Sequence, residues 1–230
     1  MTFFTKIALA TALVASMGAA SAAPVVFSSV GGAPTGVNKW NLDSDAPVGT
    51  GLGAIDLKPH AAFVTGGSSG KYAAPVLSGD NGAGFGFNGG DQAIGVDTTR
   101  YLTTGSTDAN KNAKITINFT ADQYYFGLLW GSVDAFNTME FFNNGVSVGM
   151  LNGTNVTLAA TGNQGVQGTS YVNIDLAEGF DSIVFKSTSY AFEFDNIAWS
   201  ANRAVPEPGT IALLGLGLAG LGFARRRRAA

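Results

Sequence analysis

Short runs of alternating apolar and polar residues recur along the middle of this chain, and each run predicts a β-strand because successive strand side chains point to opposite faces. No long stretch of residues 23–203 has apolar residues at helical spacing. The runs are residues 61–65, 113–119, 124–130, 138–142, 146–151, 156–159, 171–176, 182–186 and 190–199. Strands without helices between them predict an all-β body, an antiparallel β-sandwich or jelly roll, over residues 23–203.

Glycine and asparagine mark the breaks between these runs. Asn143, Asn144 and Gly145 separate two of them, and Asn-Gly tolerates the positive φ of a tight hairpin. Residues 66–112 hold the glycine-dense stretches 66–70 and 79–90 and few apolar residues, so we expect long loops there with one or two edge strands.

The front of the chain has the pattern of a secretory signal peptide. Lys6 precedes a short apolar run, and residues 1–22 end on the small residues Ala20, Ser21 and Ala22. We expect cleavage between Ala22 and Ala23, with the secretion translocon and signal peptidase as partners. The apolar run is too short to cross a hydrocarbon core of roughly 30 Å.

The back of the chain, residues 204–230, has three parts in order. Pro206 and Pro208 hold the backbone extended and present Glu207 to a protease. Residues 211–223 are apolar and predict a short transmembrane sorting helix, separate from the body. A positive cluster that stays cytoplasmic follows: Arg225, Arg226, Arg227 and Arg228.

This ordered set resembles the PEP-CTERM sorting signal of Gram-negative bacteria. The resemblance implies that a membrane exosortase cuts at Pro206, Glu207 and Pro208 and passes the protein outward to the cell surface or an exopolysaccharide or biofilm matrix. The alternative interpretation of the same residues is a plain tail anchor.

Charge and composition exclude several function classes. Between Lys6 and Arg225 the chain has eight of its 13 basic residues and all 16 acidic ones, a net charge of −8, which argues against nucleic acid as a partner. The absence of cysteine excludes disulfides, thiolate zinc sites and a cysteine nucleophile. The single histidine, His60, predicts a partly solvated strand residue rather than a ligand or base.

Two glycine motifs carry no chemistry. Gly66, Ser68 and Gly70 have the spacing of a nucleophile elbow, but no helix is predicted after them and the only histidine lies upstream. Lys71 follows a glycine, yet Tyr72 stands where a phosphate loop needs Ser or Thr.

Glu193 and Asp195 alternate along a predicted strand, so they share one face, opposite Phe192 and Phe194. We expect that face to be solvated. Asp195 with Asn196 is a candidate calcium site, because hard cations take carboxylate and amide oxygens; no other cofactor is expected.

Residues 126–138 form an aromatic strand, a polar turn and a second strand. With residues 192–197 they resemble passenger domains found ahead of PEP-CTERM tags, which are similar to jelly-roll carbohydrate-binding modules. If the body binds a glycan, the clustering of Trp130, Asp134 and Asn137 at a strand end predicts that Trp130 stacks on sugar and that Asp134 and Asn137 bind hydroxyls. The alternative places Trp130 in the core, the more usual position of an indole.

The sequence therefore predicts a non-catalytic exported surface or matrix protein, with glycan binding as a candidate role of its body. Two alternatives stay open: a secreted polysaccharide hydrolase or lyase of jelly-roll fold, and a structural adhesin.

Overall fold

The computed structural model describes residues 24–28, 32–44, 51–78, 95–105, 113–157 and 159–202. The predicted signal peptide, the predicted apolar sorting helix and the glycine-dense residues 79–90 lie outside these described residues. Among the helices in the described ranges, none is long and apolar enough to cross a membrane.

Strands make up most of the described chain. They are β1 (Val25–Ser28), β2 (Asn38–Trp40), β3 (Leu52–Leu57), β4 (Ala62–Thr65), β5 (Val76–Leu77), β6 (Gly95–Val96), β7 (Arg100–Thr103), β8 (Lys114–Gly131), β9 (Asn137–Asn143), β10 (Val146–Asn152), β11 (Ser170–Ser187) and β12 (Glu193–Ser200). Two short helices complete the described elements, α1 (Gly153–Val156) and the 3-10 turn η1 (Val166–Gly168).

Ten of these strands form one sheet in which every pairing is antiparallel. Its main path runs β10-β9-β11-β8-β12-β7-β4, while β1 pairs with β11, β2 with β12 and β3 with β8. Strands β5 and β6 pair only with each other. The all-β, antiparallel prediction is confirmed.

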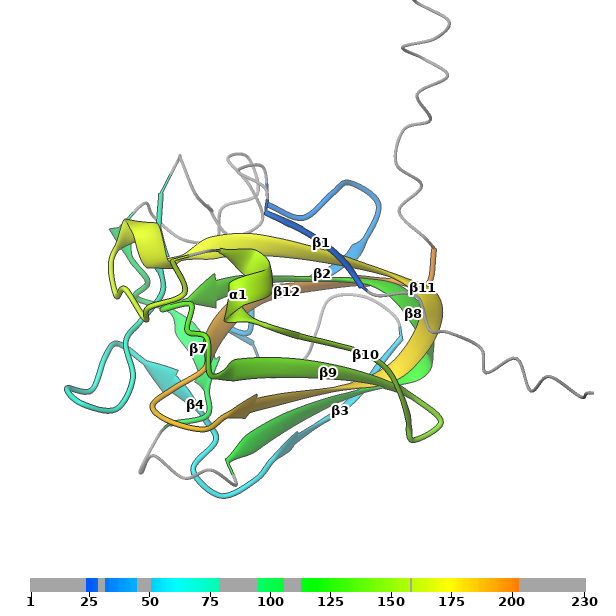
Figure 1. Cartoon of the computed structure of the whole chain (residues 1–230), viewed down its shortest axis with the longest axis horizontal. Helices are drawn as coiled ribbons and strands as arrows, with labels where there is room; N and C mark the ends of the chain where they lie inside the picture. The colour runs from blue at the N-terminus through cyan, green and yellow to red at the C-terminus, as the bar shows by residue number, and fades with distance from the viewer. Residues whose placement is uncertain are drawn as a thin grey trace, which may run out of the picture.

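Strands β8 and β11 shape the sheet, since each has 18 residues and they pair along two arms. The pairing is irregular between Asp175 and Ser182, where both strands bend at the right of Figure 1. One arm of β8 pairs with β12 and the other with β3, so the sheet folds back on itself. The sequence predicted four strands here, because exposed polar residues at the bend interrupt the alternation.

The space inside the folded sheet is filled mainly by aromatic rings. The rings of Phe185 and Phe194 stack with centroids 4.3 Å apart, and Phe141 meets Phe180 edge to face at 5.1 Å. All four side chains are fully buried. Aromatic side chains bury large apolar areas, so this cluster is the main source of stability in a chain without disulfides.

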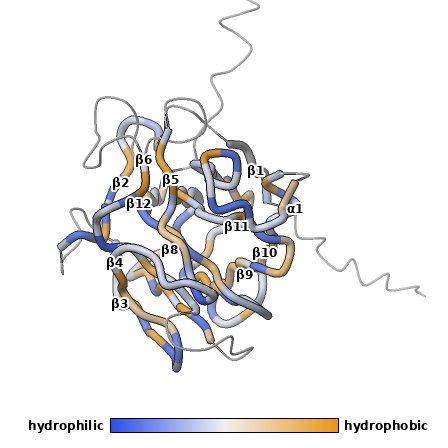
Figure 2. Tube along the Cα trace, turned by 90° about the vertical axis from the view of Figure 1, so that its left-hand side faces the viewer, coloured by the Kyte–Doolittle hydropathy of each residue, from blue (hydrophilic) through white to orange (hydrophobic). Residues whose placement is uncertain are grey.

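A second layer covers the opposite face of β8, β11 and β12. Leu77 and Ala33 pack there on Tyr125, Leu129 and neighbouring residues of the sheet. Figure 2 shows hydrophobic colour on β5 and β6, which belong to this cover. Every residue of β12 is buried as a result. The expectation of a solvated face at Glu193 and Asp195 was wrong, although the two do lie opposite Phe192 and Phe194.

Three further expectations need correction. The predicted strand 156–159 begins inside α1, where the side chain of Asn152 accepts a hydrogen bond from the Thr154 N–H and caps the helix. The region 66–112 contributes β7, which lies inside the sheet between β12 and β4 rather than at an edge. His60 occupies a turn with φ +72° because β3 ends just before it.

The Asn-Gly hairpin is confirmed. Asn143 pairs with Val146 across β9 and β10, and Asn144 and Gly145 between them have φ values of +48° and +78°.

Gly145→Ala tests this hairpin. A Cβ at Gly145 would meet no atom within 4 Å, so the cost is purely that of the left-handed backbone. We expect the free energy of unfolding to fall by about 1 kcal/mol, measured by urea denaturation. Val146→Ala, at an exposed neighbour, is the control. An unchanged midpoint for Gly145→Ala would contradict the strained turn.

Candidate functional site

The structure places Trp130 in the core rather than on a glycan surface. Its ring is fully buried and stacks on Phe192, with centroids 4.3 Å apart and planes 18° from parallel. Asn137 is also fully buried, and its Nδ2 donates to the Ala191 carbonyl at 2.8 Å. These contacts correct the expected sugar-binding roles of both residues, since neither side chain reaches the surface.

Asp134, the third predicted residue, lies at the surface of the same turn. Backbone hydrogen bonds join this turn to residues 160–168, from Gly162 to Val133 (3.0 Å) and from Ala135 to Ala160 (3.2 Å). Gly162 has φ +68°, and a Cβ there would collide with the Asp134 carboxylate. Partial burial of that carboxyl raises its pKa to about 6.

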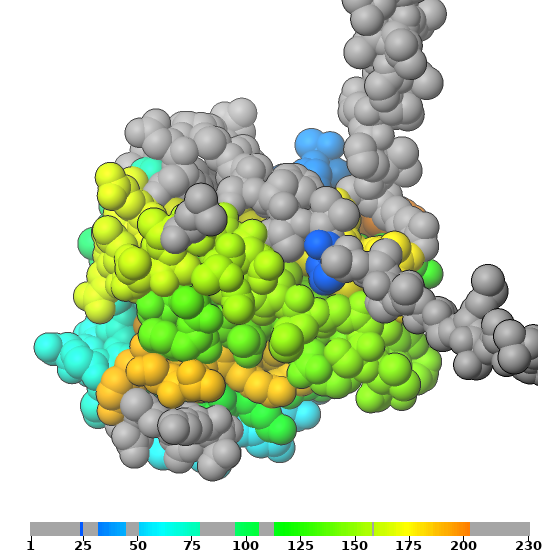
Figure 3. Space-filling view, in the orientation of Figure 1, coloured from blue at the N-terminus to red at the C-terminus, as the bar shows by residue number. Residues whose placement is uncertain are grey.

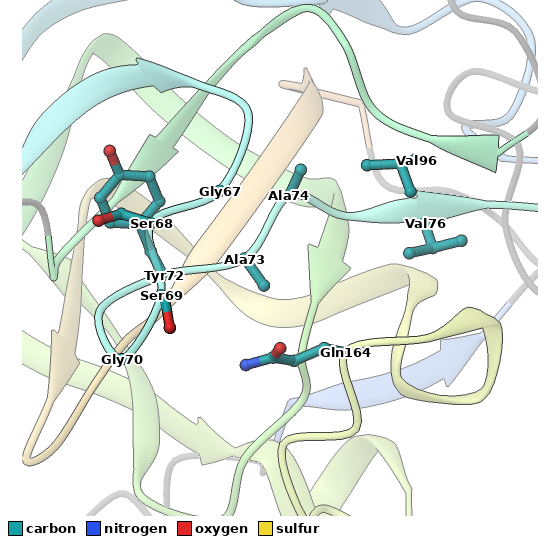
Figure 4. Close-up of a pocket in the computed structure, with 10 residues that line it drawn as sticks. All are labelled: Gly67, Ser68, Ser69, Gly70, Tyr72, Ala73, Ala74, Val76, Val96 and Gln164. Carbon is teal, nitrogen blue, oxygen red and sulfur yellow. The ribbon is translucent and has the colours of Figure 1, made fainter.

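A pocket of about 350 Å³ opens beside this pair of loops (Figure 4). Most of its lining comes from the loop after β4, which includes Ser68, Gly70 and Tyr72 of the two glycine motifs. The residues are Gly67, Ser68, Ser69, Gly70, Tyr72, Ala73, Ala74, Val76, Val96 and Gln164. The volume lies within the range of small-ligand sites, and the lining combines an aromatic ring, hydroxyls and an amide.

Hydrogen bonds from the sheet hold the pocket loop in place. The hydroxyl of Tyr101 donates to the Gly66 carbonyl, and the Val76 N–H donates to Thr169 Oγ1 at 3.1 Å. Between these anchors the Ala73 N–H donates to Glu193 Oε1 at 3.2 Å. The wall of the pocket is therefore fixed at both ends and in its middle.

Glu193 supports the loop from below. Its side chain is buried, and Oε2 has no hydrogen-bond partner among the described residues. Burial and, to a smaller extent, the nearby Asp134 charge raise the pKa of Glu193 to about 8, and this net value includes the lowering effect of the Ala73 hydrogen bond. The carboxyl is therefore mostly protonated at neutral pH, when it can accept from Ala73 without carrying a buried charge.

The candidate calcium pair, Asp195 and Asn196, lies under the same cover. Both are fully buried, and Asn196 has φ +49° where the pairing of β12 with β8 shifts register. The Tyr171 hydroxyl donates to the Asn196 carbonyl at 3.1 Å. Within the part of the chain that the structure describes, no three acidic or histidine residues group around a metal position. Calcium binding stays a prediction.

The sequence located the correct end of the sheet but missed the pocket. Asp134 approaches Gly162, two residues before the pocket residue Gln164. Neither Tyr72 nor Gln164 was expected to bind a ligand, because each belongs to a loop without strand periodicity. The Gly66, Ser68 and Gly70 motif forms a turn closed by the Ser68–Tyr72 bridge, which agrees with its dismissal as a nucleophile elbow.

Comparison with known families supports the interpretation of the other end of the chain. Residues 204–228 match the PEP-CTERM protein-sorting motif, which confirms the resemblance inferred from Pro206, Glu207, Pro208 and the arginine cluster. The motif implies processing by a membrane exosortase, with export and sorting to the cell surface. No curated protein matches the chain.

Glu193→Gln tests the role of the buried carboxyl. Wild-type Glu193 holds its proton in the folded state up to about pH 8 but loses it near pH 4.5 when unfolded, so stability falls as pH rises through this interval. The slope is up to about 1.4 kcal/mol per pH unit. The variant keeps an acceptor for Ala73 and cannot ionise, so its stability should stay nearly flat from pH 6 to 8 and exceed wild type at pH 8.

Thermal unfolding at several pH values measures both profiles. The control is Glu140→Gln, which removes a carboxylate paired with Lys186 at 3.2 Å on the surface. Parallel wild-type and Glu193→Gln profiles between pH 6 and 8 would rule out the protonated support.

Proposed function

We propose that this chain is an exported, exosortase-processed surface or matrix protein whose body binds glycan without catalysis. The observation that carries the first half is the PEP-CTERM motif at residues 204–228. The second half rests on the pocket between the loop after β4 and Gln164. The folded-back antiparallel sheet is compatible with the jelly-roll architecture that the sequence resembles.

The pocket has the chemistry that a sugar needs. Tyr72 is half-buried and its ring meets Tyr101 edge to face at 6.5 Å, so it offers a rigid aromatic surface. Gln164 is exposed and places an amide with both donors and an acceptor across the pocket (Figure 4). Ser68 and Ser69 add hydroxyls. Loops fixed on a rigid sheet are common positions for binding residues.

Binding is favoured over hydrolysis by the position of Glu193. Polysaccharide cleavage by paired carboxylates needs both groups in contact with the sugar. Glu193 and Asp134 have raised pKa values, but Ala73 covers Glu193 and the carboxyl is buried. The proposed role of Glu193 is therefore to position the pocket loop. A hydrolase or lyase remains the second candidate, supported only by this acid pair.

Glycan-array binding by the exported protein, with and without calcium, tests the proposal. Tyr72→Ala and Gln164→Ala should each lower affinity about fivefold or more, because each removes a ring contact or a hydrogen bond worth about 1 kcal/mol or more. Melting temperatures should stay close to wild type for Gln164→Ala.

Matched controls come from the same chain. Gln167→Ala changes an exposed glutamine three residues away that does not line the pocket, and Tyr124→Ala changes a half-buried tyrosine near the bend. Trp130→Ala is unsuitable as a binding probe, because a core truncation of this size costs ~3–5 kcal/mol. Equal losses in the control and pocket variants, or release of sugar fragments by the wild type, would contradict the proposal.

A further inference from the structure

The two ends of the described body lie in one row of the sheet. Val25, the first residue of β1, pairs with Asp175 of β11, which pairs with Tyr125 of β8, which pairs with Ser200, the last residue of β12. Neighbouring strands are about 4.8 Å apart, so three spacings put Val25 and Ser200 roughly 14 Å from each other. Asp175 and Tyr125 are the last regular pair before the irregular bend of β8 and β11, so Val25 and Ser200 lie beside that bend, which is at the right of Figure 1.

The pocket lies at the other end of the same strands. Strand β12 runs from Glu193, which holds the pocket loop, to Ser200 at the bend. Its eight residues span about 23 Å at roughly 3.3 Å per residue. Pro75, next to the pocket, approaches Gly131, where β8 ends. In Figure 3, atoms of the segments near residues 60 and 190 share the left-hand side, away from the bend.

The connection from the body to the sorting motif is short. The Asn202 N–H donates to Ser200 Oγ at 3.0 Å and ties the chain to the end of β12. Four residue steps separate Asn202 from Pro206, which allow at most about 14 Å of extended chain. The cleavage element therefore stays close to the bend, and the connection to the sorting segment leaves the body from that end.

We propose that the precursor is mounted end-on. The bend of β8 and β11 faces the membrane that holds the sorting segment, and the pocket opens on the end farthest from it. The signal peptide joins the body at the same bend, because Val25 follows Ala23 by two residues. The body can therefore fold completely while both terminal segments occupy one bilayer. This arrangement does not depend on glycan binding.

Fluorescence energy transfer from a dye on the body to an acceptor lipid in the bilayer tests this orientation. Because the chain has no cysteine, a single introduced cysteine gives one labelling site. The full precursor, with Pro206, Glu207 and Pro208 changed to alanine to prevent cleavage, is reconstituted into phosphatidylcholine–phosphatidylglycerol vesicles that carry an acceptor lipid. A donor dye is placed at the pocket end with Ser69→Cys or Gln167→Cys, and at the bend with Ala121→Cys or Glu178→Cys. All four positions are exposed.

Donors at residues 121 and 178 should transfer energy clearly more efficiently than donors at residues 69 and 167, as expected for positions on opposite sides of a span of about 23 Å. Equal efficiencies would indicate a body lying on its side or tumbling freely, and the reverse order would place the pocket at the membrane. Either result overturns the proposal. Failure of the precursor to float with the vesicles would overturn it as well, because the mount requires a membrane-held tail.

Discussion

The paired bend of β8 and β11 is the constraint on which the rest of this structure depends. Two 18-residue strands stay hydrogen-bonded to each other on both sides of the bend, so a single sheet supplies two walls around the aromatic core. Gly179 allows the bend, because a Cβ there would press against Asp122 of the neighbouring strand. Strands β3 and β9 join one arm, and β1 and β12 join the other. A chain without cysteine is thus closed by strand pairing and packing alone.

The arm that contains β12 is covered on both faces, and this cover creates the pocket. Residues that would otherwise meet water, among them Glu193, are buried under the loop after β4. A neutral carboxyl satisfies the Ala73 N–H at lower cost than a buried charge would. Tyr101 is also a neutral support. Burial and the nearby Glu193 raise the pKa of its hydroxyl, which donates to the Gly66 carbonyl. The side chains that hold the pocket loop are therefore polar but nearly uncharged at neutral pH.

Sequence periodicity predicted the strands that alternate cleanly and failed where tertiary contacts decide. The hairpin at Asn144 and Gly145 follows from local backbone chemistry and was predictable. Strand β7 was missed because its residues are buried between β12 and β4 and show no alternation. The burial of Glu193 and Asp195 was missed because the covering loop comes from a distant, glycine-rich region. Ala73 of this loop, which donates a hydrogen bond to Glu193, is 120 residues away in the sequence. Asp134 was placed at the correct end of the sheet, whereas Tyr72 and Gln164 become neighbours only through the folded loops.

The protein combines a β body that has a pocket with a sorting segment that is expected to be removed. The decisive observation is therefore which residues the chain retains once it reaches the cell surface. The PEP-CTERM motif at residues 204–228 implies exosortase processing, and the short connection after Asn202 keeps the processed end beside the body. Intact-mass spectrometry of protein released from the surface of cells that express the native chain measures this directly. The account predicts a species that starts at Ala23 and lacks Arg225, Arg226, Arg227 and Arg228. A surface-released species that retains those four arginines would contradict it.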